Sequence, residues 1–162
     1  MIGGLVPLLL IGYGNPARQD DGLGPALAAA IEKLNLDGVT VDSGYQLGVE
    51  DAETAARHRT VIFADAATTG PEPFAFRALA PESPQSFSSH SVAPAAVLSL
   101  AHDAFGSNVA GYLLAIRGYS FEMFVETLTE KAAANLAAAE KWLAAALRAG
   151  SFGPAPGDVA GK

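Results

Sequence analysis

Four carboxylates follow apolar runs of the chain, where side chains can meet at one edge of a sheet. Asp20 and Asp21 close a glycine-rich turn behind the first run, whereas Asp42 and Asp65 directly follow two later ones. Each could instead cap a helix or close a turn, which are common roles of Asp. One Asp is enough for a cap, however, and acidic positions behind three runs exceed what turns usually need. The pattern therefore favours a shared site for a cation.

The chain offers imidazole but no thiolate to complete such a site, because it has three histidines and no cysteine. His90 lies between a Pro/Ser-rich loop and a predicted helix, where a histidine taken alone is more often exposed or capping than a ligand. His58 lies between two arginines, and His102 is expected on the polar side of a helix. Carboxylates with imidazole form a ligand set that suits nickel, zinc or iron.

A dinucleotide site is the first alternative, because Gly12 and Gly14 form a Gly-x-Gly turn and Ala17 fits the permissive third position. In such sites the pyrophosphate rests on the N–H groups of the following helix. Here Asp20 and Asp21 occupy that approach, where they would repel a phosphate and attract a cation. Nucleotide binding is therefore the minor interpretation.

A serine hydrolase is the second alternative, and it requires a Gly-x-Ser-x-Gly elbow after a strand. The sequence contains no such elbow, and Ser43 lacks the preceding glycine. Nucleophilic serine catalysis is therefore not expected.

Apolar runs alternate with helical patterns along the chain, which is typical of α/β proteins. Strands are predicted at 7–13, 38–42, 60–65, 74–79 and 111–117, and helices at 22–34, 50–58, 92–105 and from 127 to about 148. A capping box at 127–130 is expected to open the last helix. We predict a single α/β domain with a mostly parallel, mixed five-stranded sheet and helices on both faces. Ligands of such sheets bind beyond the carboxyl ends of the strands.

Length and composition limit the remaining possibilities. The 162 residues have room for one domain, predicted at 1–149, and the Gly/Pro/Ala-rich residues 150–162 are expected to form a disordered tail. The formal charge is −7 and the basic residues are scattered, so no nucleic-acid partner is expected. The apolar start is too short to span a bilayer and lacks a basic flank. We therefore expect a cytoplasmic protein without a membrane partner.

Taken together, these residues resemble the hydrogenase maturation proteases, from the first strand to about Trp142. The most specific element is Gly-x-Gly-Asn-x-x-Arg-x-Asp-Asp-Gly-x-Gly at 12–24. The other three are Asp42 at a strand end, Ala-Asp-Ala at 64–66, and Ser-His at 89–90 before a helix. One short motif would be weak, but four in order at the expected spacing make a strong resemblance.

The resemblance implies a cytoplasmic endopeptidase, of the aspartic type in the classification of the family. Such enzymes remove a C-terminal extension from the large-subunit precursor of a nickel–iron hydrogenase after nickel has been inserted. The family's metal-binding and catalytic positions fall on Asp21, Asp65 and His90, with Asp42 and Asp20 as possible support. Nickel is expected to arrive with the substrate, and zinc or cadmium could replace it in vitro. We expect the enzyme to be a monomer.

A protein of another class remains as the alternative function. The same α/β scaffold could serve a binding module without peptidase activity, such as a nucleotide- or metal-sensing domain or a maturation chaperone. Protection of the purified protein by nucleotide or by divalent metal would distinguish the two classes.

Overall fold

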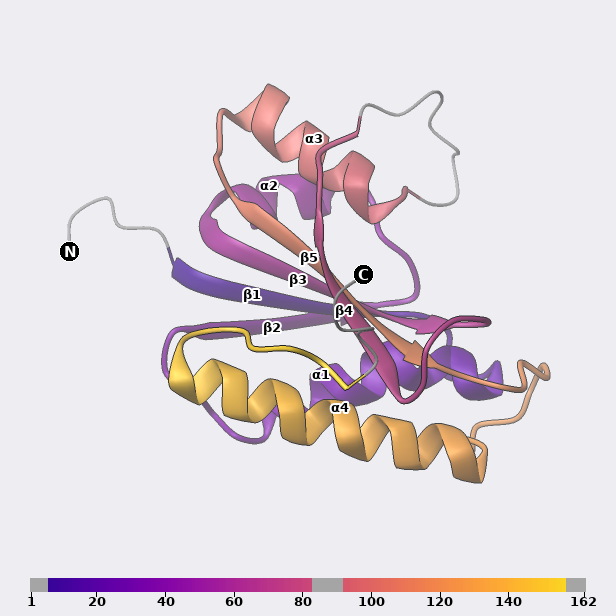
Figure 1. The fold of residues 1–162 in the computed structure, drawn as a ribbon. Helices are drawn as coiled ribbons and strands as arrows, with labels where there is room; N and C mark the ends of the chain where they lie inside the picture. Colours follow the sequence, from indigo (N-terminus) through magenta and orange to yellow (C-terminus); the bar gives the residue numbers. More distant parts are fainter. Residues whose placement is uncertain (1–5, 83–91, 157–162) are drawn as a thin grey trace.

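A computed structural model describes residues 6–82 and 92–156, which form one sheet with helices on both faces (Figure 1). The strands are β1 (Val6–Tyr13), β2 (Val39–Gly44), β3 (His58–Ala67), β4 (Phe74–Leu79) and β5 (Ala110–Arg117). The helices are α1 (Leu23–Glu32), α2 (Glu50–Ala56), α3 (Pro94–Phe105) and α4 (Glu130–Ala149), with a short 3-10 helix, η1 (Gln19–Gly22), before α1.

The sheet has the strand order β2-β1-β3-β5-β4. Neighbouring strands are parallel except for β4, which pairs antiparallel with β5 at one edge. This arrangement confirms the predicted single α/β domain with a mixed, mostly parallel five-stranded sheet.

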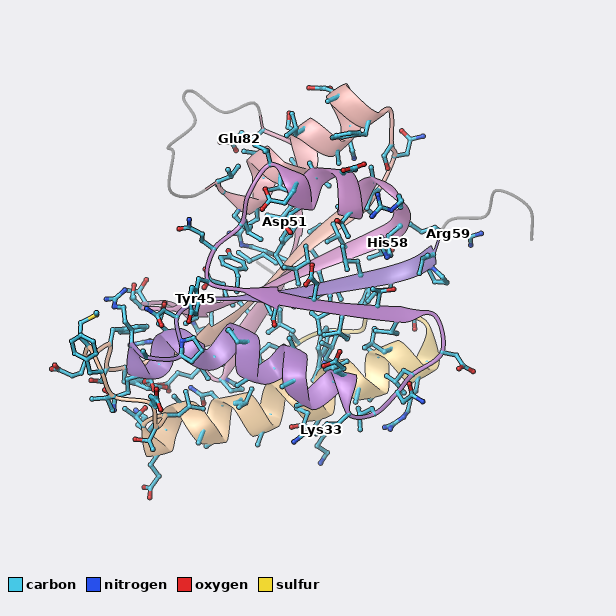
Figure 2. The ribbon with its side chains drawn as sticks, turned by 180° about the vertical axis from the view of Figure 1, so that it is seen from behind. Lys33, Tyr45, Asp51, His58, Arg59 and Glu82 are labelled. Carbon is cyan, nitrogen blue, oxygen red and sulfur yellow. The ribbon has the colours of Figure 1, made fainter. Side chains whose placement is uncertain are left out.

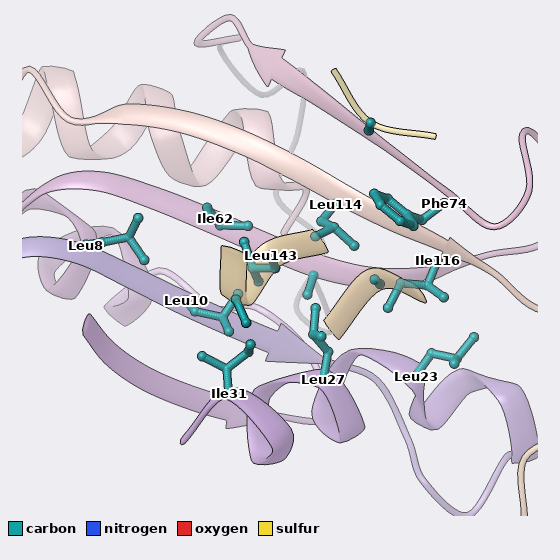
Figure 3. Close-up of a cluster of buried hydrophobic side chains, with 14 of the residues drawn as sticks. Leu8, Leu10, Leu23, Leu27, Ile31, Ile62, Phe74, Leu114, Ile116 and Leu143 are labelled. Atoms are coloured by element: carbon teal, nitrogen blue, oxygen red, sulfur yellow. The ribbon is translucent and has the colours of Figure 1, made fainter. Parts of the chain in front are cut away.

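Each face of the sheet is covered by two helices, α1 and α4 on one side and α2 and α3 on the other (Figure 1). Side chains of β3 alternate between these layers: Ile62 belongs to the core beneath α1 and α4 (Figure 3), whereas Phe63 belongs to the other core. Both are fully buried. Burial on both faces explains why β1 and β3 contain continuous apolar runs. No helix in the described ranges is long and apolar enough to cross a membrane.

The second helix ends earlier than predicted, and the strand after it begins earlier. Helix α2 stops at Ala56 instead of residue 58, and His58 already belongs to β3. The His58 side chain is 4% exposed, and its Nδ1 lies 2.8 Å from the carbonyl oxygen of Thr54. Burial of this ring fixes His58 at the amino edge of the sheet, where Figure 2 shows it beside Arg59.

The predicted capping box at 127–130 is not the cap that forms. Thr129 is the N-cap of α4, and its hydroxyl oxygen accepts a hydrogen bond from the backbone N–H of Ala132. The backbone N–H and hydroxyl of Thr129 also donate to the Asp20 carboxylate. This long-range partner selects Thr129 over Thr127 as the first residue of the cap.

Residues 150–156, predicted as part of a disordered tail, pack against the domain instead. The ring of Phe152 lies 5.0 Å from that of Phe76, and Trp142 donates its indole N–H to the carbonyl oxygen of Pro154. Burial of the Phe152 ring and satisfaction of the indole N–H favour this ordered path. The segment helps to line a pocket of about 250 Å³ at the amino edge, with Pro7 and Leu8 on its other side.

Candidate active site

The topology singles out the carboxyl ends of β1 and β3. Helix α1 connects β1 to β2 on one face of the sheet, whereas α2 connects β2 to β3 on the other. Where such connections diverge, a crevice opens beyond the adjacent strand ends, and ligands of open α/β sheets bind there. Gly12 of β1 pairs with Ala64 of β3. The next residue of each strand, Tyr13 and Asp65, therefore lies near the carboxyl end at the same level of the sheet.

Asp65 is partly buried and points to the same face of the sheet as Phe63. Its carboxylate accepts hydrogen bonds from the Tyr13 hydroxyl and, at 2.8 Å, from the backbone N–H of Ala66. Burial outweighs the two hydrogen bonds and, together with the charge of Asp21, raises the pKa of Asp65 to about 6. Burial and the same two carboxylates raise the pKa of Tyr13, so its hydroxyl stays protonated as a donor.

Asp21 is brought beside this pair by the turn between β1 and η1. The Asn15 side chain accepts from the backbone N–H of Ala17 at 2.9 Å, and the backbone N–H of Asn15 donates to Asp21 Oδ2 at 2.7 Å. Gly14 has φ +145°, and a Cβ there would lie 2.0 Å from the carbonyl oxygen of Asp21. Only glycine lets the turn fold back so tightly.

The motif glycines therefore serve close packing in this chain. A Cβ on Gly24 would lie 2.4 Å from the carbonyl oxygen of Tyr13 and 2.5 Å from that of Ala64, so α1 rests directly on the ends of β1 and β3. The space that a pyrophosphate would need beside Gly14 is filled by Asp21. This packing speaks against the dinucleotide interpretation.

Asp20 faces away from its neighbour, into the protein, and is 0% exposed. Oδ2 accepts hydrogen bonds from the backbone N–H groups of Tyr119 (2.8 Å) and Ser120 (3.2 Å) and from the Thr129 hydroxyl (2.7 Å), while Oδ1 accepts from the Thr129 N–H (2.8 Å). Burial alone would raise the pKa of Asp20, but these bonds outweigh it and keep the pKa below its usual value. A carboxylate engaged in this way supports the site by holding a loop.

Asp42 is exposed on β2 and lies at some remove from the pair. It pairs with Ile11, two residues before the end of β1, and its Oδ1 accepts from the backbone N–H of Ser43 at 2.9 Å. Its charge acts on Asp51 in α2. Figure 2 shows Asp51 in the α2 layer, on the face of the sheet opposite α1. Strand β1 therefore separates Asp42 from Asp65.

His90, the third predicted ligand, lies outside the described residues. Helix α3 begins at Pro94 and leads through Gly106 into the amino end of β5, so its first turn points toward the carboxyl edge (Figure 1). Val92 packs against the core beneath α2 and α3. Within residues 6–82 and 92–156, no three His, Asp or Glu side chains are placed to hold a metal ion. Asp21 and Asp65 are thus the two predicted ligands that the structure brings together.

The other histidines are placed away from this pair. His58 lies at the opposite edge of the sheet, and His102 Nε2 lies 2.7 Å from the carbonyl oxygen of Val109, before β5. Sequence reasoning did not single out Tyr13. The sequence signal that could have identified Tyr13 is its position at a strand end between Gly12 and Gly14. The register of β1 against β3 places it level with Asp65.

The fold and these residues define an α/β domain with an acidic site where its connections diverge. No protein-family model matches the chain, and no curated protein matches it. Among solved structures it is similar to the NiFe hydrogenase maturation protease HycI from Thermococcus kodakarensis KOD1, with a TM-score of 0.70 and 22% identity over 90% of this chain and 94% of that chain.

Two structures from E. coli agree with this similarity. The hydrogenase maturating endopeptidase HybD has a TM-score of 0.67 and 22% identity, covering 89% of this chain and 93% of its own. The endopeptidase HycI has a TM-score of 0.65 and 19% identity, covering 96% and 99%. The chain therefore has the fold of hydrogenase maturation proteases over most of its length, as the sequence resemblance implied.

Proposed function

We propose that this protein is an endopeptidase that removes the C-terminal extension from a nickel-loaded large-subunit precursor of a nickel–iron hydrogenase. The observation that carries the proposal is the pairing of Asp21 with Asp65 where the connections of this fold diverge. Ser–His–Asp chemistry has no elbow in the sequence, so activation of water by carboxylates is the route that these residues support.

The proposed substrate feature is nickel already bound by the precursor. Two carboxylates held together disfavour joint ionisation, so a cation between them would relieve their repulsion. Asp21, Asp65 and His90 would complete the coordination of that nickel and position the neighbouring peptide bond. A nickel-free precursor would lose this anchoring interaction, so selection would follow from differential binding. Zinc or cadmium would substitute in vitro.

Asp65 would also act as the general base, through a carboxylate oxygen that does not bind nickel. A base is most effective when its pKa lies near the working pH, and without a bound cation the pKa of Asp65 is raised to about 6. The Tyr13 hydroxyl and the Ala66 N–H would orient Asp65 toward a water molecule next to the scissile carbonyl. Aspartic-type chemistry of this kind agrees with the class that the sequence resemblance implies. We further propose that the enzyme acts in the cytoplasm as a monomer.

The decisive test is incubation of the purified protein with a nickel-loaded large-subunit precursor, followed by mass spectrometry. We expect loss of the C-terminal extension, and no loss with the nickel-free precursor. Asp21→Asn, Asp65→Asn and His90→Ala should each abolish processing while the far-UV circular dichroism spectrum is retained. Normal processing by any two of these variants would contradict the proposed trio. Binding of the precursor without cleavage would favour the binding-module alternative.

A further inference from the structure

The connection from β5 to α4, residues 118–129, extends beyond the carboxyl ends of the strands (Figure 1). We refer to it as the β5–α4 loop. Its first residue, Gly118, donates its N–H to the carbonyl oxygen of Ala67 at 2.8 Å, and its last, Thr129, bonds to Asp20. A Cβ on Gly118 would lie 2.9 Å from the Cβ of Asp20, so glycine permits this close contact. The loop therefore starts and ends against Asp20, the sequence neighbour of Asp21.

A third attachment fixes the loop near its middle. A single parallel bridge pairs Arg18 with Val125, and the N–H of Gln19 donates to the carbonyl oxygen of Val125 at 2.8 Å. Asp20 holds the backbone N–H groups at the other side of the tip. The same short segment that carries Asp21 thus holds both sides of the loop.

The tip between these attachments presents two apolar side chains to solvent. Met123 is 53% exposed and Phe124 is 86% exposed. Phe124 also has φ +65°, a left-handed conformation that is unfavourable for an aromatic residue. Backbone strain that persists in a well-anchored segment clusters at binding and active sites. An exposed aromatic ring with that backbone therefore indicates a contact with another molecule.

Charged residues frame the apolar pair. Glu122 and Glu126 are exposed on either side of it in the sequence, and the protein as a whole carries a formal charge of −7. Such a frame attracts a segment with basic side chains and disfavours an acidic one. An apolar centre within a polar rim is also the usual composition of a protein-binding surface.

We propose that Met123 and Phe124 bind an apolar segment of the precursor polypeptide close to its cleavage point, with Glu122 and Glu126 pairing with basic side chains that flank it. This inference rests on the proposed function and names the part of the enzyme that selects the polypeptide. Its location argues for the precursor as the partner, because residues 18–20, which anchor the loop, directly precede Asp21. A peptide bound at the tip would extend to Asp21 and Asp65, and its binding contacts would lie outside these two carboxylates.

Steady-state processing of the nickel-loaded precursor tests the proposal. Phe124→Ala should raise KM about 10- to 100-fold with kcat nearly unchanged, as expected when a buried aromatic contact is lost. Glu122→Gln/Glu126→Gln should raise KM less and flatten its dependence on NaCl between 50 and 500 mM. Phe105→Ala is the matched control, since Phe105 is 48% exposed at the end of α3, on the amino side of the sheet.

Folding and binding measurements separate the possible outcomes. Phe124→Gly should unfold at the same temperature as the wild type or higher, because glycine tolerates the positive φ, and yet raise KM as Phe124→Ala does. If the wild type cleaves the precursor and the Phe124 variants match Phe105→Ala in KM, the inference is overturned while the proposed function stands. If the wild type does not cleave the precursor, the proposed function fails. The affinities of the wild type and of Phe124→Ala for the precursor then test the inference, and equal affinities overturn it.

Discussion

Asp20 and Asp21 are neighbours in the sequence but do different work. Asp20 is fully buried and accepts hydrogen bonds from residues about a hundred positions away, whereas Asp21 stays partly exposed beside Asp65. Sequence reasoning identified both as acidic residues at a strand end. It could not assign the inward direction to Asp20, because that direction depends on Tyr119, Ser120 and Thr129, which only the fold brings near.

Ligands of open α/β sheets bind beyond the carboxyl ends of the strands, and this rule was sufficient to predict that Asp21 and Asp65 lie together. The rule needs only the order and direction of the strands. The Tyr13–Asp65 contact requires the register of β1 against β3, which no local pattern in the sequence encodes. The ligand role of His90 stays a prediction, as does the role of nickel.

Substitution of Asp65 should stabilise the protein at neutral pH. The folded-state pKa of about 6 exceeds the ordinary value of 3.8, so the folded protein binds this proton more tightly than the unfolded chain. The contribution of Asp65 to the free energy of unfolding is therefore fully present below about pH 4, and it is lost as the pH rises to about 6. Asp65→Asn should add roughly 1–2 kcal/mol to the free energy of unfolding at pH 7.5, and little at pH 4.

Urea denaturation at the two pH values measures this difference. Asp42→Asn, which changes an exposed carboxylate, is the control and should leave stability unchanged at both. If Asp65→Asn is less stable than the wild type at pH 7.5, the charge of Asp65 does not destabilise the folded state.

At the scale of elements, periodicity and composition were enough to predict every strand and the alternation that builds the sheet. The boundaries that shifted were set by tertiary contacts. The cap of α4 moved to Thr129 because Asp20 holds that residue, and residues 150–156 follow an ordered path because Phe152 joins an aromatic cluster with Phe76 and Trp142. Partners of this kind lie far apart in the sequence, so a local pattern cannot reveal them.

Asp20→Asn should loosen the β5–α4 loop and destabilise the whole domain. The amide would place an N–H group among donors that now share two carboxylate oxygens, leaving buried N–H groups unpaired. We expect a loss of about 2–4 kcal/mol in the free energy of unfolding. Asp21→Asn is the adjacent control and should cost less than about 1 kcal/mol. Equal stabilities of the two variants in urea denaturation would contradict the structural role of Asp20.

At the scale of the whole molecule, the site occupies one edge of a domain whose two cores lie on either side of the sheet. A cation bound between Asp21 and Asp65 would stabilise the folded state alone, because the unfolded chain does not hold them together. Zinc or cadmium at about 100 times its dissociation constant should raise the melting temperature by roughly 5–10 °C.

Differential scanning fluorimetry at pH 7.5 and pH 5 measures this effect. The increase should be smaller at pH 5, where protons compete for Asp65. It should be absent in Asp21→Asn and Asp65→Asn and retained in Asp42→Asn. If the cation raises the melting temperature of all three variants equally, it does not bind between Asp21 and Asp65.

The start of β1 has a practical consequence, because Val6 and Pro7 lie at the amino edge of the sheet. A bead, sensor chip or fluorescent fusion attached ahead of Val6 would lie on the amino side of the sheet. The carboxyl edge would stay open to a large protein partner. Under the proposed function, protein immobilised in this way should therefore capture and release the precursor as freely as protein in solution.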